Sequence, residues 1–344
     1  LNQYANYWEA VREYYYPFES GLKAGTAEVY EHEIPGGQYS NLRPQAIALG
    51  LEHRFEQIKK NYAAVNRMFG DIVKVTPSSK VVGDMAMFMT ANGLDEEDVM
   101  AQGETLAFPD SVVDLFSGKL GQMEGGFPVE LSALVLKGKK PLDGPPGSLM
   151  DPVDFEKDFA AFKEEFDDSL TELDFLSYEM YPNVFRGFYE HQKEFGDVHY
   201  LPTQTFFYGL RQGDEILVKL QRGKTIVIRY VYRSHTDENG FCRVTFDLNG
   251  QARSVQIRDE TVVPKTVAHR KAVERNEIGS PLMGRLATVL VEVGDEVDKD
   301  TPIFVIEAMK METTITAPFK STIRAVHLET GGLVAQGDLV IELE

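Results

Sequence analysis

The chain has 344 residues with 35 Lys and Arg against 54 Asp and Glu, and its formal net charge of −19 argues against nucleic acid as a partner. Apolar residues make up 43% of the chain, which is ordinary for a protein with real cores, and the length suits two or three domains. No apolar run reaches about 18 residues, so we expect neither a transmembrane helix nor a membrane partner.

The chain start and the cysteine content bear on the cellular compartment. Residues 1–8 are not a signal peptide, because no basic segment precedes an apolar one. The absence of an initiator Met at Leu1 indicates a piece of a longer protein. The single Cys242 excludes an intramolecular disulfide, and with no export signal the expected compartment is the reducing cytoplasm.

Helices are predicted for the first part of the chain. Aromatic and apolar residues recur near helical spacing over 2–16 and again over 44–69, where one or two helices are interrupted near Gly50. Between these segments, Gly36 and Gly37 follow a proline and predict a turn.

The stretch 70–84 has an unusual pattern. A short apolar run ends at Thr76, which precedes a proline, and Ser78 and Ser79 then stand as a predicted N-cap ahead of a Met-rich helix at 81–89. Two interpretations stay open. The polar residues are ordinary capping groups, or, with the backbone N–H groups of the helix start, they form a corner that binds a carboxylate.

The next segments also favour helices. Short acidic helices with glycine turns are predicted over 95–141, and 141–152 is a Pro/Gly-rich link. Phenylalanines at helical spacing over 155–166 predict an apolar core stripe, and another helix is expected at 184–195. Residues 151–200 hold 14 Asp or Glu against four Lys or Arg, a net −10, which we interpret as a solvated helix face and not as a docking patch.

Strand patterns begin after about residue 201. Turn signals separate five β-rich runs, at 206–208, 215–220, 225–232, 241–246 and 254–257. They predict a small antiparallel β unit with alternating faces. We interpret this unit as structural, because it contains no nucleophile–base pairing and no metal-ligand spacing. The basic, weakly patterned residues 263–276 predict a linker.

The C-terminal part contains an internal repeat. Segment 280–307, shifted by 37 residues, falls on 317–344 without a gap, so that Gly294 meets Gly331. We expect two half-domains of short strands, related by a pseudo-two-fold axis, in a flattened β-barrel.

Lys310 lies where the two repeats meet. A buried strand is predicted at 303–306 and a second β-rich run at 313–316. Lys310 is therefore expected in a short connection, at a hairpin tip that projects into solvent. The alternative is an ordinary exposed turn lysine in a small β domain.

The residues around Lys310 resemble a known modification site. The unbroken pentad Glu307-Ala-Met-Lys-Met311 is similar to the sequence around the biotin-accepting lysine of biotinyl carrier domains. The resemblance implies that Lys310 carries biotin covalently, with Met309 and Met311 as its flanking residues.

The whole chain resembles the C-terminal part of the pyruvate carboxylase family. The motifs that carry this resemblance are His32-Glu-Ile-Pro-Gly-Gly-Gln-Tyr-Ser-Asn-Leu42 and Gly70-Asp-Ile-Val-Lys-Val-Thr-Pro-Ser-Ser-Lys-Val-Val-Gly-Asp84. Residues 1–200 resemble the helical end of the carboxyltransferase domain, 201–262 the allosteric and tetramerisation domain, and 277–344 the biotinyl carrier domain. The resemblance implies a multidomain α+β chain, with the linker at 263–276 and a lipoyl-like C-terminal domain.

The resemblance also implies an activity. The family carboxylates pyruvate to oxaloacetate with ATP, a reaction that supplies gluconeogenesis, and Lys310 would bear biotin as the mobile carboxyl carrier. In the family a threonine of the Val-Thr-Pro-Ser-Ser-Lys motif relays a proton between biotin and pyruvate, which implies a catalytic role for Thr76. Ser78, Ser79 and Lys80 are further candidates for substrate binding.

Parts of the family's machinery have no counterpart in this sequence. The metal-binding histidines, a carboxylated lysine and the arginine that holds pyruvate belong to the family's barrel, and no glycine-rich phosphate loop occurs here. The resemblance therefore implies that the divalent metal, ATP and bicarbonate bind in the missing domains. This piece alone is expected to be inactive.

The implied partners are pyruvate, a biotin protein ligase, the remaining domains of the same enzyme, and further copies in a homotetramer. Two alternatives stay open. One is a non-catalytic, stand-alone carrier or scaffold subunit. The other is a lipoyl carrier of an oxo-acid dehydrogenase, although such domains usually have an acidic residue before the lysine, so Met309 and Met311 favour biotin.

Overall fold

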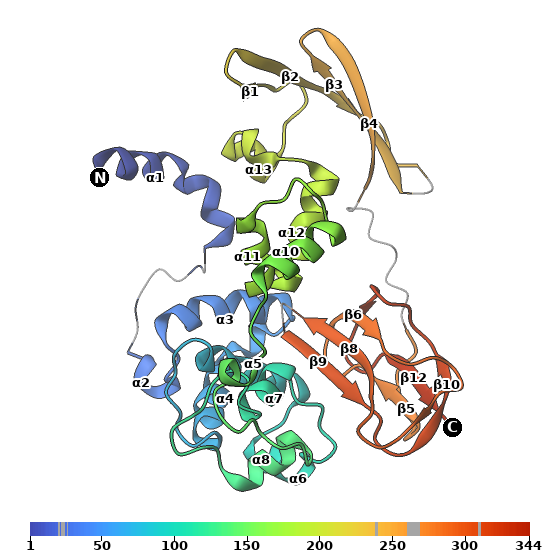
Figure 1. The fold of residues 1–344 in the computed structure, drawn as a ribbon. Helices are drawn as coiled ribbons and strands as arrows, with labels where there is room; N and C mark the ends of the chain where they lie inside the picture. The colour runs from blue at the N-terminus through green and yellow to red at the C-terminus, as the bar shows by residue number, and fades with distance from the viewer. Residues whose placement is uncertain (20, 22–24, 26, 238–239, 260–268, 309–310) are drawn as a thin grey trace. The chain divides into compact units, whose positions relative to one another are not determined.

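The structure is a computed structural model that describes residues 1–19, 21, 25, 27–237, 240–259, 269–308 and 311–344 (Figure 1). These residues divide into two compact units, of which the first joins 1–19 to 151–267 and the second joins 20–150 to 268–344. Helices and antiparallel sheets make up both units, as the predicted α+β class requires. None of the helices within the described ranges is long and apolar enough to span a membrane.

The second unit begins with a helical part. Its helices are α2 (Val29–His32), α3 (Gly36–Ala48), α4 (Phe55–Met68), α5 (Ser78–Asn92), α6 (Glu96–Gln102), α7 (Asp110–Phe116), α8 (Val129–Leu136) and α9 (Pro146–Leu149). A 3-10 helix at Glu52–Arg54 follows the break near Gly50 that the sequence predicts. The turn predicted at Gly36 and Gly37 is wrong, because α3 begins at Gly36, directly after Pro35, whose fixed φ suits a helix entrance.

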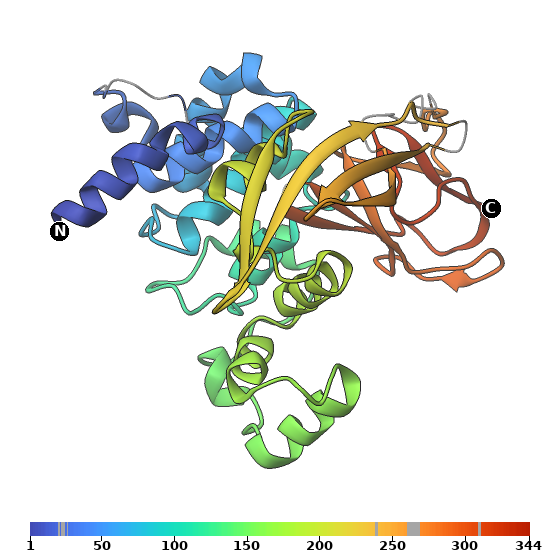
Figure 2. The same ribbon diagram turned by 90° about the horizontal axis from the view of Figure 1, so that it is seen from above.

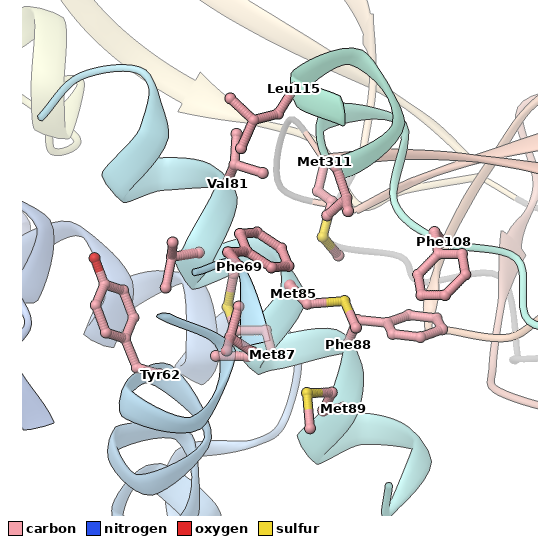
Figure 3. Close-up of a cluster of buried hydrophobic side chains, with 14 of the residues drawn as sticks. Tyr62, Phe69, Val81, Met85, Met87, Phe88, Met89, Phe108, Leu115 and Met311 are labelled. Carbon is pink, nitrogen blue, oxygen red and sulfur yellow. The ribbon is translucent and has the colours of Figure 1, made fainter. Parts of the chain in front are cut away.

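Helix α5 is the centre of this part. Every residue from Ser78 to Thr90 except Lys80 is buried, so the helix is covered on all sides, as its continuous apolar and Met-rich sequence favours. It packs on α4 and on α7. The resulting cluster includes Tyr62, Phe69 and Phe88, which are almost fully buried (Figure 3).

The C-terminal part of the second unit consists of two four-stranded antiparallel sheets (Figure 1). One sheet has the order β5-β12-β10-β7, with bounds Glu277–Gly279, Leu339–Leu343, Ser321–Val326 and Glu296–Val297. The other has the order β11-β6-β8-β9, with bounds Leu333–Val334, Gly284–Val289, Pro302–Ala308 and Met311–Thr316. An apolar cluster that includes Leu286, Phe304, Ile323 and Ile341 fills this part.

The strands reproduce the predicted repeat. A shift of 37 residues takes β6 onto β10, β7 onto β11, and the start of β8 onto the start of β12. Each half lends its shortest strand to the opposite sheet, because β7 pairs with β10 and β11 pairs with β6. This exchange is the pseudo-two-fold arrangement expected from the sequence.

The residues before β5 are bonded to this part of the chain. The carbonyl of Arg270 accepts from the N–H of Leu339 at 2.7 Å, and the N–H of Ala272 donates to Gly337 at 2.8 Å. Lys271 Nζ lies 2.7 Å from the Asp338 carboxylate. The predicted linker 263–276 therefore has a bonded C-terminal end, while its first residues, up to 268, lie outside the described residues.

The first unit contains α1 (Asn2–Tyr15), a 3-10 helix at Tyr16–Phe18, and then α10 (Phe155–Glu165), α11 (Glu172–Met180), α12 (Pro182–Phe195), a 3-10 helix at Val198–Tyr200 and α13 (Thr203–Tyr208). The predicted phenylalanine stripe is confirmed, since Phe159, Phe162 and Phe166 pack in one aromatic cluster with Phe175 and Phe185. The helices predicted at 2–16 and 184–195 are also confirmed.

The sheet of the first unit has four strands in sequential order, β1 (Glu215–Gln221), β2 (Lys224–Arg233), β3 (Phe241–Leu248) and β4 (Gln251–Arg258). Figure 2 shows these long, twisted strands in yellow and gold. The four corresponding predictions are confirmed, but the strand expected at 206–208 is wrong. Those residues end α13, where Tyr208 donates its hydroxyl proton to the carbonyl of Tyr14 at 2.7 Å.

Candidate functional site

In the sequence, the predicted acceptor lies between strands β8 and β9. The two strands pair antiparallel as far as Ala308 opposite Met311. Met309 and Lys310 follow Ala308 in the sequence and lie outside the described residues. The strands therefore leave a connection of two residues, the length that joins antiparallel strands most tightly.

The residues that adjoin this connection are buried. Ala308 is 4% exposed and Met311 is 3% exposed. Met311 belongs to the hydrophobic cluster of the helical part, and Figure 3 shows its side chain pointing toward Met85 of α5, with Leu115 of α7 close by. The sequence predicts a hairpin tip in solvent, whereas the described residues at its base pack against helices.

Hydrogen bonds accompany this apolar contact. Asp110, the first residue of α7, accepts from the backbone N–H of Thr314 at 3.1 Å and from its hydroxyl at 2.8 Å. Gln336 donates to the carbonyl of Ala91 at 3.3 Å and to the side chain of Asn92 at 3.1 Å, at the end of α5. Among the described residues, these hydrogen bonds join the C-terminal sheets to the start of α7 and to the end of α5.

Thr76 lies in the turn that leads into α5. The peptide bond between Thr76 and Pro77 is cis, and Thr76 is exposed. Its hydroxyl makes no hydrogen bond with any residue in the described part of the chain. A hydroxyl in that state can both donate and accept a proton. The capping interpretation of Thr76 therefore has no bond to support it.

The N-cap predicted at Ser78 and Ser79 is wrong. The N-cap position of α5 is Pro77, and no side chain caps the helix. The Ser78 hydroxyl instead lies 2.5 Å from the carbonyl of Val73 and 2.7 Å from that of Val75, and it accepts from the Val75 N–H at 3.1 Å. Ser78 therefore ties the start of α5 to the residues before it, whereas a capping side chain accepts from an N–H further along the helix.

Ser79 and Lys80 also have internal partners. Ser79 is buried, and its carbonyl accepts from the hydroxyl of Tyr62 at 3.1 Å. Lys80 Nζ lies 2.6 Å from the carboxylate of Asp84, one turn further along α5. Burial raises the pKa of Asp84, while the bonds from Lys80 and from Ser111 at 2.7 Å act in the opposite direction.

These contacts join elements that sequence reasoning did not connect. Asp84 of α5 accepts a hydrogen bond from Ser111 of α7. Asp110, the residue before Ser111, accepts one from Thr314 of β9. Sequence analysis missed Asp84, Asp110 and Thr314 as site residues. The one local signal in the sequence is Pro109-Asp110, which is typical of a helix start. No residue spacing predicts the contact of Asp110 with Thr314, which lies 204 residues away.

Comparisons with known proteins agree with this arrangement. Residues 29–229 match the family model described as a conserved carboxylase domain, and residues 276–343 match the model described as a biotin-requiring enzyme. Over the whole chain the relatives are pyruvate carboxylases. Identity is 46% to that of Bacillus subtilis, across 99% of this chain, and 39% to the human mitochondrial one.

The solved structures point the same way. The carboxyl transferase domain of Rhizobium etli pyruvate carboxylase with pyruvate and biocytin is similar at a TM-score of 0.67 and 45% identity, over 75% of this chain and 44% of that one. A similar match is found to a complete multifunctional pyruvate carboxylase from the same organism, over 76% of this chain and 26% of that one.

The fold and the comparisons together define a class. The chain belongs to the conserved carboxylase domain family and has a C-terminal domain of the biotin-requiring type. The resemblance to pyruvate carboxylase inferred from the sequence is confirmed, and a biotin carrier is favoured over a lipoyl carrier or a stand-alone scaffold. The chain spans 30% of the length of the Bacillus subtilis relative.

Proposed function

We propose that the complete protein is a pyruvate carboxylase, which converts pyruvate to oxaloacetate with ATP and bicarbonate. The observation that carries this proposal is the packing of Met311, the residue after Lys310, in the same apolar cluster as α5, which begins two residues after Thr76. The base of the carrier hairpin thus packs against the helix that follows the proposed carboxyl-transfer residue. The divalent metal, ATP and bicarbonate are assigned to the family's other domains.

Lys310 is the proposed attachment point for biotin. The described hairpin fits this role, because β8 and β9 leave a two-residue connection in which a lysine ε-amine can form an amide with the biotin carboxyl group. A biotin protein ligase would supply that carboxyl group in activated form. When bound, biotin supplies a nitrogen that accepts and releases a carboxyl group. Met309 and Met311 flank the acceptor in the sequence and are proposed as part of its recognition.

Thr76 is the proposed proton relay of carboxyl transfer. Its exposed hydroxyl, which has no partner among the described residues, can accept one proton and donate another. The neighbouring residues have a supporting role in this proposal. Ser78 holds the turn, Ser79 is buried, and Lys80 is paired with Asp84, and the three stay further candidates for substrate binding in this proposal.

The sheet β1–β4 is proposed to assemble the enzyme into a homotetramer. All residues of β4 are exposed, including Val255 and Ile257, and Leu217 of β1 is exposed as well. Apolar side chains in such positions are typical of a surface that contacts another protein. A second copy of the chain is the proposed occupant.

The finer description of the chain follows the family. We assign 1–200 to the carboxyltransferase domain, 201–262 to the tetramerisation domain, 263–276 to a linker, and 277–344 to a biotinyl domain, for which a flattened barrel stays a prediction. The cytoplasm is the proposed compartment, in line with a single cysteine, although relatives such as the mouse protein are named mitochondrial.

The test of this function uses the full-length enzyme. Oxaloacetate formation should depend on pyruvate, bicarbonate, ATP and biotin, and Lys310→Arg should abolish it. Lys320→Arg is the matched control, because Lys320 lies on the same domain and is exposed. Activity that persists in Lys310→Arg would contradict the proposal.

A further inference from the structure

We infer, on the basis of the proposed function, that Asp110 is a latch that docks the carrier strand β9 on helices α5 and α7, and that the docked state screens the acceptor hairpin from biotin protein ligase. The inference starts from the contact between Asp110 and Thr314, which lies outside the residues proposed for the chemistry.

The geometry of β9 makes this contact a specific one. β9 is the last strand of its sheet, so one side of it has no neighbouring strand. Backbone N–H groups point alternately to the two sides of a strand, and that of Thr314 points away from β8, to the Asp110 carboxylate. Asp110 therefore supplies the partner that an edge strand otherwise lacks.

The apolar part of the contact is small. Of the described residues from 277 onward, Leu282 and Met311 belong to the buried cluster of the helical part. Gln336 adds two hydrogen bonds to the end of α5. A contact of a few apolar side chains, with Ala107 packed against the C-terminal cluster, and a few polar bonds can open and close, as a carrier that visits another site requires.

Docking also covers one side of the base of the acceptor hairpin. Met311 is buried in the cluster of the helical part, while Ala308, on the other strand, is buried beside Gly284 of its own sheet. A ligase that modifies Lys310 must reach the chain on both sides of it, so it can act only on the undocked carrier. Weakening the latch at Asp110 should therefore increase the fraction of chains open to the ligase.

The experiment compares two substitutions on the same helix. Asp110→Ala removes both acceptors of the latch, whereas Asp114→Ala removes an equal charge whose partner is Lys119 at the surface. Neither substitution changes the carrier sequence that a ligase recognises. Asp110→Asn keeps one acceptor oxygen and should give an intermediate result.

Two measurements are made on the full chain. The first is the deuterium exchange rate of the Thr314 amide, and the second is the initial rate of biotin incorporation with ligase, biotin and ATP. Because the charged acceptor of two hydrogen bonds is removed, both rates should rise at least about tenfold in Asp110→Ala and stay unchanged in Asp114→Ala.

Thr314→Val provides a test that leaves α7 intact. It removes the hydroxyl donor, keeps the shape of the side chain and retains the N–H donor, so a smaller rise of about threefold in biotin incorporation is expected. This variant separates a lost latch from a damaged helix.

The outcomes are distinct. Unchanged amide exchange in Asp110→Ala overturns the latch, and faster exchange without faster biotin incorporation overturns the screening. If no version of the chain accepts biotin, the proposed function fails, but the amide exchange rates still decide whether Asp110 holds β9.

Discussion

The backbone N–H of Gly331 donates to the carbonyl of Leu286 at 2.7 Å, and the equivalent bond recurs between Gly294 and Ile323 at 2.8 Å. A shift of 37 residues relates Gly294 to Gly331, and Leu286 to Ile323, so each bond joins one half of the carrier to the other. The internal repeat therefore specifies the contacts between the halves as well as the strands within them.

The two glycines should respond alike to substitution. Gly294 has a φ of 98° and Gly331 a φ of 91°, values that an L side chain rarely adopts. Gly294→Ala and Gly331→Ala should each lower the free energy of unfolding of the carrier by about 1–2 kcal/mol. Denaturant unfolding of the two variants measures this loss. A loss confined to one of them would contradict the equivalence of the repeats.

Thr76→Ala should impair carboxyl transfer selectively in the complete enzyme. The loss of a positioned proton-transfer group lowers a rate by ~10²–10⁴-fold, so oxaloacetate formation should fall by that factor. ATP cleavage that depends on bicarbonate should continue, because it uses another domain. Loss of a helix cap would instead cost about 1 kcal/mol of stability with turnover nearly intact.

Thr76→Ser is the matched control for that experiment, since it keeps the hydroxyl and should retain part of the activity. Both variants must first be shown to fold and to accept biotin. A proportional fall of both partial reactions in Thr76→Ala, or no fall in either, would make Thr76 a structural residue.

The carboxyl group of Glu277 should make the stability of the carrier fall at acid pH. The pKa of Glu277 is lowered, first by the N–H groups of Val273 and Glu274, which donate at 2.8 and 3.1 Å, and then by Arg270. A carboxyl group whose pKa is lowered by folding stabilises the folded state at a pH above its unfolded pKa of about 4.3. This stabilisation is lost as the pH falls through the lower pKa of the folded state.

Glu277→Gln should therefore lower the Tm of the carrier at pH 7, and the difference from the parent chain should shrink below about pH 4. Thermal unfolding across this pH range measures the effect. Glu296→Gln, at an exposed position of the same domain, is the control and should show no such trend. A difference that is constant with pH would contradict the assignment.

Assembly should depend on the exposed face of β4. Val255 is 51% exposed and Ile257 is 41% exposed, and they lie two residues apart on one face of the strand. A Val255→Lys, Ile257→Lys double variant should lower the molar mass that light scattering measures for the parent protein. Gln256→Lys, on the opposite face, should leave it unchanged. Deletion of 201–262 should lower the molar mass further. An unchanged oligomer would refute the role of the β1–β4 sheet in assembly.

Local patterns predicted many elements well. The repeat indicated strands that the structure places within one or two residues, because alternation and turn residues act locally. Two of the errors have different causes. A pair of glycines is typical of a turn, but the helix entrance behind Pro35 tolerates Gly36 and Gly37. The aromatic run at 206–208 is typical of a strand, but a tertiary contact, that of Tyr208 with Tyr14, accompanies a helix there.

The site was only partly accessible to such reasoning. The pentad around Lys310 and the turn at Thr76 stand out in the sequence, because their chemistry depends on adjacent residues. The bond of Asp110 to Thr314 and the burial of Met311 depend on how two distant segments pack, and no pattern within either segment indicates it.

The central claim is that Lys310 carries biotin, and mass spectrometry of the full chain after incubation with biotin protein ligase, biotin and ATP tests it most directly. The account predicts one added biotinyl group, located on Lys310 by peptide fragmentation, absent in Lys310→Arg and retained in Lys320→Arg. An unmodified chain, an added lipoyl group, or biotin that persists in Lys310→Arg would contradict it.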